Sequence, residues 1–103
     1  MKRLLSSAIL GLGLGLAAPA FADLALATSK NCMSCHSVDR KVLGPSFKDV
    51  AAKYKGNAGA ADMLATKIIK GGSGVWGPVP MPANTQVSEA DAKKLAAWVL
   101  TAR

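Results

Sequence analysis

Five consecutive residues, Cys32-Met33-Ser34-Cys35-His36, hold both cysteines and the only histidine of this 103-residue chain. If the segment forms one helical turn, Cys32 and Cys35 at positions i and i+3 project from the same face. Two sulfurs at that spacing can form thioethers with the two vinyl groups of a haem, and His36 beside them can bind the iron. The segment therefore predicts a covalent c-type haem, with Cys32 and Cys35 as anchors and His36 as an axial ligand.

Other uses of a Cys-x-x-Cys pair fit this sequence less well. A thioredoxin-like dithiol is typical of a βαβ setting, and no strong β-pattern lies near the motif. A structural zinc site needs four ligands, usually Cys or His, whereas the whole chain has two cysteines and one histidine. A disulfide between Cys32 and Cys35 stays open as the state of a chain without haem.

The N-terminus has the pattern of an export signal. Lys2 and Arg3 form a positive start, an apolar stretch covers 4–18, and Ala20-Phe21-Ala22 has the small-x-small pattern of a cleavage site. An uncleaved membrane anchor is the alternative, but the apolar stretch is shorter than the roughly 20 residues of a spanning helix. We therefore expect residues 1–22 to be a cleaved secretory signal peptide, 23–103 to be one domain, and the periplasm to be its location.

The expected mature chain is small and basic. A core of this size gives only marginal stability without a crosslink or a bound metal, and a covalently held haem would supply such a link. Without Lys2 and Arg3 the chain keeps 11 basic residues against 6 acidic ones. The lysines are spread along the sequence without interleaved aromatic residues, so we expect no nucleic acid partner. The positive charge favours either steering toward acidic patches on redox partners or a solvated surface that only aids solubility.

Four stretches of the mature sequence predict helices. Residues 47–55 carry apolar side chains three or four positions apart, the spacing of one helical face. Residues 88–101 begin with Ser88 as N-cap and an acid three positions later. Residues 23–31 and 58–70 supply the remaining two helices, the second of which ends at a Gly-Gly pair. The sequence therefore predicts an all-α fold of about four to five short helices.

The long loop 71–87 is where we expect the second axial ligand, because a loop of this length in a small domain is usually functional. Within it, Met81 lies between Pro80 and Pro82. The fixed φ of the prolines keeps this stretch out of helix and sheet and lowers the entropy lost on placing the thioether. The loop therefore predicts Met81 as the ligand. The alternative is that the Met81 side chain only fills space as an apolar plug in a proline-rich loop.

The other methionines are less suitable ligands. Met1 leaves with the signal, Met33 lies inside the attachment turn, and Met63 falls within a predicted helix, where core packing is the simpler role. Ligation by Met and His raises the reduction potential of a haem. With both axial positions filled, the iron changes oxidation state with little change in coordination, which suits electron transfer.

With these residues in hand, the mature chain resembles the small bacterial class I cytochromes c, specifically the cytochrome c-551 (c8) type. The resemblance implies the class I cytochrome c fold, with short helices wrapped around one covalent haem c. It also implies a monomeric electron carrier that is not an enzyme. It rests on the CxxCH motif and on four further segments: 42–45 (VLGP), 49–53 (DVAAK), 74–82 (GVWGPVPMP) and 97–100 (AWVL).

The resemblance also implies roles for three residues around the haem. The Pro45 carbonyl would accept a hydrogen bond from His36 Nδ1, which fixes the histidine tautomer. The Trp76 indole would donate to a haem propionate, and Asn84 would lie near the Met81 sulfur. Each has a simpler alternative: an ordinary turn for Pro45, core packing for Trp76, and a turn in the loop for Asn84.

The partners that the resemblance implies are periplasmic or membrane-bound redox enzymes, such as the haem cd nitrite reductase, terminal oxidases and cytochrome c peroxidase. Two rival functions are a small haem peroxidase or gas sensor with a displaceable Met81, and a tightly held subunit of a larger redox complex. For a carrier, we expect a docking surface near the exposed haem edge. Its apolar centre would lie around Met33, Val42 and Pro80, with Lys30, Lys41 and Lys67 as candidates for a surrounding ring.

Overall fold

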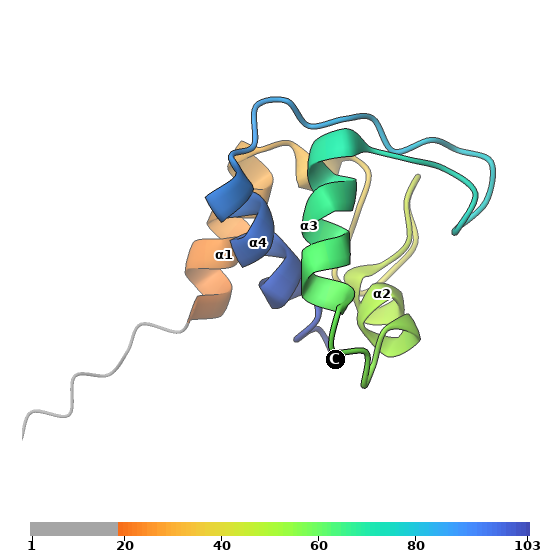
Figure 1. Cartoon of the computed structure of the whole chain (residues 1–103), viewed down its shortest axis with the longest axis horizontal. Helices are drawn as coiled ribbons and strands as arrows, with labels where there is room; N and C mark the ends of the chain where they lie inside the picture. Colours follow the sequence, from red (N-terminus) through yellow and green to blue (C-terminus); the bar gives the residue numbers. More distant parts are fainter. Residues whose placement is uncertain (1–18) are drawn as a thin grey trace, which may run out of the picture.

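The computed structural model describes residues 19–103, which form four α-helices and one short 3₁₀ helix. Figure 1 shows α1, α3 and α4 grouped together, with α2 set to one side of α3. The predicted all-α fold is therefore confirmed. In chain order the elements are α1 (Pro19–Ser29), η1 (Cys32–Ser34), α2 (Phe47–Lys53), α3 (Ala60–Lys70) and α4 (Glu89–Val99).

The predicted signal peptide lies mostly outside the described residues. Helix α1 begins at Pro19 and continues past Ala22, after which cleavage is predicted. Cleavage at that position stays a prediction. Across residues 19–103, no helix has both the length and the apolar character needed to cross a bilayer.

Serine side chains define where two of the helices begin. Ser46 precedes α2 and its hydroxyl accepts a hydrogen bond of 3.0 Å from the Asp49 amide. Ser88 precedes α4 and accepts one of 3.1 Å from the Asp91 amide. Each serine satisfies one of the four amides that a helix N-terminus leaves unpaired. The predicted cap at Ser88 is confirmed.

The core is built mainly from small side chains. Helix α3 packs most extensively against α4, and alanines at the contacts allow the helices to approach closely. Leu95 is the one large side chain that is fully buried within the described residues. The larger cluster consists of Ala27, Ala65, Val87, Ala92, Leu95 and Ala96.

A second, smaller cluster joins α2 to the C-terminal helix. It contains Phe47, Val50 and Val99, and Trp98 packs against both clusters. The rings of Phe47 and Trp98 meet edge to face, with centroids 5.4 Å apart. This contact holds α2 beside α4 and leaves space between α2 and α3.

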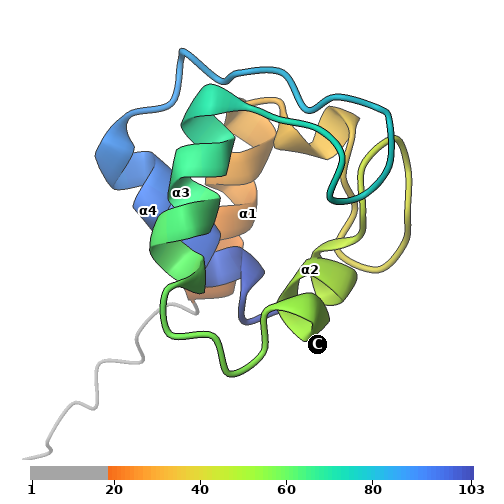
Figure 2. The ribbon, with the colours of Figure 1, turned by 45° about the vertical axis from the view of Figure 1, so that its right-hand side comes forward.

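Two loops lie on the same side of the molecule, as both views show (Figures 1 and 2). One covers residues 37–46 between η1 and α2, and the other covers 71–88 between α3 and α4. Together they frame the open side of the helix bundle.

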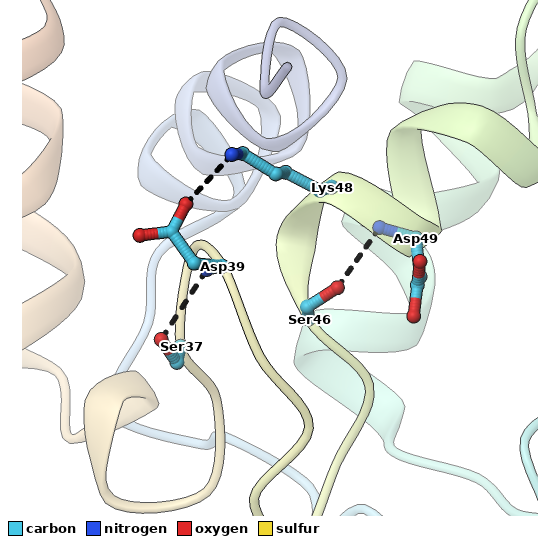
Figure 3. A network of polar contacts seen from close by, with 5 residues as sticks. All are labelled: Ser37, Asp39, Ser46, Lys48 and Asp49. Atoms are coloured by element: carbon cyan, nitrogen blue, oxygen red, sulfur yellow. Dashed lines mark hydrogen bonds and ion pairs between the residues drawn. The ribbon is translucent and has the colours of Figure 1, made fainter.

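Polar contacts hold the first loop against α2, as Figure 3 shows. Lys48 pairs with Asp39 at 2.9 Å, and the Asp39 amide donates to the Ser37 hydroxyl at 3.3 Å. The Phe47 amide donates to the Ser37 carbonyl at 2.9 Å. The start of α2 is therefore tied to the residue that directly follows the CxxCH motif.

Candidate cofactor site

An apolar pocket opens between the two loops and the facing sides of α2, α3 and α4. Its lining is dominated by aliphatic, aromatic and proline side chains, with few polar groups. Such a lining suits a large, flat, apolar ligand. The apolar residues include Leu43, Pro45, Phe47, Val50, Leu64, Ile68, Val75, Val79, Pro80, Pro82, Ala96 and Val99.

The CxxCH segment forms a tight turn at one end of this pocket. The amides of Cys35 and His36 both donate to the Cys32 carbonyl, at 3.2 and 3.0 Å. Cys35 and His36 line the pocket, while Cys32 packs against the larger core cluster. The predicted helical turn is therefore present, in the narrower 3₁₀ form.

Cys32 and Cys35 do not form a disulfide with each other. Burial raises the pKa of the Cys32 thiol above its ordinary value. Within residues 19–103, no three His, Cys, Asp or Glu side chains are grouped so that they could hold a metal ion.

His36 is fixed in one orientation by its neighbours. Its Nδ1 lies 2.8 Å from the Pro45 carbonyl oxygen. A carbonyl can only accept, so Nδ1 carries the proton and Nε2 keeps its lone pair free for a metal. The ring also stacks on Phe47, with centroids 5.0 Å apart. The contact expected between His36 and Pro45 is therefore present.

Met81 reaches the same pocket from the second loop. It forms an isolated β-bridge with Gly72 and is half-buried. Met63 lies half-buried on α3, and Met33 packs against both core clusters. The structure thus brings His36 and Met81 to one pocket and directs Met33 into the core.

A family model described as cytochrome c matches residues 24–103. The chain belongs to the cytochrome c family. Its relatives place it with the small class I cytochromes of the c-551 type, which carry one covalently attached haem c. This cytochrome therefore carries haem c as well, and Cys32 and Cys35 fit the family's CxxCH motif.

Three relatives show how far the similarity extends. Cytochrome c-551 of Azotobacter vinelandii is 63% identical over 73 residues, 71% of this chain and 88% of its own. Cytochrome c-552 of Hydrogenobacter thermophilus is 50% identical over 101 residues, 98% of each chain. The crystal structure of wild-type Nitrosomonas europaea cytochrome c552 matches 78% of this chain and 99% of its own, with 55% identity and a TM-score of 0.76.

The pocket of this cytochrome fits a haem. Gly44 lies against the His36 ring so closely that an added Cβ would come 2.6 Å from Cε1. A histidine and a methionine in an apolar lining are one set of donors that suits a six-coordinate c-type haem. The absence of a side chain at Gly44 therefore leaves room for the His36 ring, and the apolar lining of the pocket suits the haem.

Trp76 and Asn84 occupy different surroundings. Trp76 lines the pocket and belongs to neither core cluster. The side-chain nitrogen of Asn84 (Nδ2) donates to the Ile68 carbonyl at 2.8 Å. The side-chain oxygen of Asn84 accepts a hydrogen bond from the Gln86 side chain at 3.2 Å. These bonds tie the second loop to the end of α3. Contacts of Trp76 with a propionate and of Asn84 with the Met81 sulfur stay predictions.

Two contributors to the site were not predicted from the sequence. Phe47 supports the His36 ring, and Gly44 makes room for it. The Gly44-Pro45 pair in a loop was the available signal for Gly44, whereas Phe47 gave none, because its sequence pattern is that of an ordinary helical residue. Lys67 was expected in a ring around the haem edge and is instead half-buried in the pocket wall.

Replacing Gly44 with alanine should displace the His36 ring and destabilise the protein by about 1–3 kcal/mol, the usual cost of overpacking. Denaturant unfolding of the haem-loaded protein measures this. Gly59→Ala is the matched control, because a Cβ there would lie 3.6 Å from its nearest neighbour, an ordinary contact. Equal stability of the two variants would contradict the close approach of Gly44.

Proposed function

We propose that this cytochrome is a periplasmic one-electron carrier whose haem is attached through Cys32 and Cys35 and ligated by His36 and Met81. The observation that carries the proposal is that His36, with its Nε2 free, and Met81 line the same apolar pocket. The predicted export signal supports the location.

Each residue would contribute a distinct physical effect. The Pro45 carbonyl orients His36 and raises the basicity of its ligating nitrogen. Met81 supplies a neutral, soft sulfur that stabilises ferrous iron and raises the reduction potential. The apolar lining limits access of water to the site. Held by these residues, a haem would supply one-electron chemistry with little change in coordination.

Voltammetry of the purified haem-loaded protein separates a carrier from a peroxidase. We expect a reversible one-electron wave that does not change when hydrogen peroxide is added. A catalytic current with peroxide would contradict the proposed role as a carrier and favour an enzyme with a displaceable Met81.

The proposed docking surface lies at the mouth of the pocket. Leu43 and Val79 line the pocket there, and Val42, which does not line it, is 47% exposed beside Leu43. Of the lysines expected around it, Lys41 is exposed, whereas Lys67 is part of the pocket wall. Lys53 is an exposed cation 5.5 Å from the Trp76 ring. We infer that partners with acidic patches bind here.

Charge reversal by Lys41→Glu and Lys53→Glu together should slow electron transfer to an acidic redox partner by about tenfold at low ionic strength. Weak redox encounters bury little area, so these charges act mainly on the association rate. The difference should shrink at about 0.15 M salt, where the screening length is roughly 8 Å. Stopped-flow rates over a salt series measure it.

Lys93→Glu with Lys94→Glu is the matched control, because both residues are exposed on α4 and neither lines the pocket. The control pair makes the same change in net charge. If the two pairs slow the reaction equally, net charge rather than a local docking surface governs the rate.

A further inference from the structure

Gly71 ends helix α3 in a backbone conformation that side chains rarely adopt, with φ 71° and ψ −168°. Its amide still donates to the Lys67 carbonyl at 2.8 Å, as a continuation of the helix. An added Cβ would collide with the Met81 carbonyl oxygen and lie 2.8 Å from the Ala83 amide nitrogen. The end of α3 is therefore in direct backbone contact with the segment that contains Met81.

This contact adjoins a pair of hydrogen bonds that fixes the register of the second loop. The Gly72 amide donates to the Met81 carbonyl at 3.0 Å, and the Met81 amide donates to the Gly72 carbonyl at 2.8 Å. In an extended pairing, a slip by one residue turns the side chain to the opposite face. The pairing with Gly72 thus decides whether Met81 faces the pocket.

The neighbours of Met81 restrict it further. Pro82 limits the residue before it to extended backbone, and Asn84 attaches the following segment to the Ile68 carbonyl through both its amide and its side chain, at 3.2 and 2.8 Å. With its backbone paired and its conformation restricted, Met81 can adjust little except its side-chain rotamer. Any shift of the segment away from α3 would move the sulfur with it.

We propose that Gly71 is a positioning residue for Met81, acting because it has no side chain at the point where the Met81 carbonyl meets the end of α3. The inference rests on the proposed ligation of the haem iron by Met81. A Cβ at this position would push the Met81–Ala83 segment outward, break the pairing with Gly72, and loosen the bond from sulfur to iron.

The chain offers a matched control for the strain of alanine at positive φ. Gly56 has φ 78°, and an added Cβ there would meet nothing within 4 Å. Gly56 also does not line the pocket. Alanine at this position carries the backbone strain without the collision, so the effects of strain and collision can be separated.

The test is the binding of added imidazole to the ferric haem-loaded protein, followed together with the near-infrared charge-transfer band of methionine-ligated iron. Gly71→Ala should weaken the band and raise the apparent affinity for imidazole by roughly tenfold, since the competing methionine is bound for less of the time. Gly56→Ala should keep the band, and its affinity for imidazole should stay within about twofold of that of the unaltered protein.

Hydrogen exchange of the unaltered protein provides a second measurement if Gly71→Ala does not accumulate with haem. The Met81 amide should be protected, whereas free exchange of this amide would overturn the inference. An unchanged band and affinity in Gly71→Ala, or an equal change in Gly56→Ala, would also overturn it while leaving the ligation intact. A missing band in the unaltered protein would instead overturn the proposed ligation, and this inference with it.

Discussion

Replacing Met81 with alanine is expected to abolish the near-infrared charge-transfer band of the ferric protein. It should also lower the reduction potential by about 0.1 V or more, out of the roughly 0.8 V range that axial ligands span. A thioether is soft and neutral and stabilises ferrous iron. Water or hydroxide in its place would stabilise ferric iron instead. Absorption spectra and voltammetry of the purified variant measure both effects.

Met63→Ala is the matched control for this experiment. Met63 is a half-buried methionine on α3, and it does not line the pocket. The Met63→Ala variant should therefore keep the near-infrared band and the reduction potential of the unaltered protein, with at most a loss of stability. A band that survives Met81→Ala would show that another residue is the ligand.

Changing both Cys32 and Cys35 to serine is expected to abolish covalent attachment and folding together. A hydrophobic core in a domain of this length rarely supplies more than about 3–5 kcal/mol. Without a haem in the pocket, its apolar lining would face water. Circular dichroism should show an unfolded chain, and acid-acetone should extract any haem that is present.

Cys35→Ser alone should keep one thioether and unfold at a lower denaturant concentration. Ser34→Ala, an exposed change within the same turn, should keep both thioethers and the mass of one added haem. A double serine variant that retains haem through acid-acetone extraction would contradict attachment at these two cysteines.

The helices were largely predictable because their signals are local. The start of α4 at Glu89 follows from Ser88, whose hydroxyl accepts the Asp91 amide. The ends were less accurate: the helix expected over 47–55 stops at Lys53, because Tyr54 leaves helical geometry with φ −103° and ψ 12°. No residue at that position is a strong stop signal, so the end depends on packing against the rest of the fold.

The residues of the candidate site were likewise predictable where their signals are local and not where they depend on contacts between distant segments. His36 and Met81 were predicted from adjacent cysteines in one case and adjacent prolines in the other, both local patterns. The inward packing of Met33 and the place of Lys67 in the pocket wall depend on how distant segments meet. The bond from Asn84 to the Ile68 carbonyl likewise arises only where the second loop crosses the end of α3.

The most direct test of the account is the absorption spectrum of the purified protein in its oxidised and reduced forms. Attachment through Cys32 and Cys35 with ligation by His36 and Met81 predicts low-spin c-type spectra in both states. The oxidised form should also show the near-infrared methionine band, and reduction should remove it. A high-spin spectrum, or an oxidised low-spin spectrum that lacks this band, would contradict the proposed His/Met site.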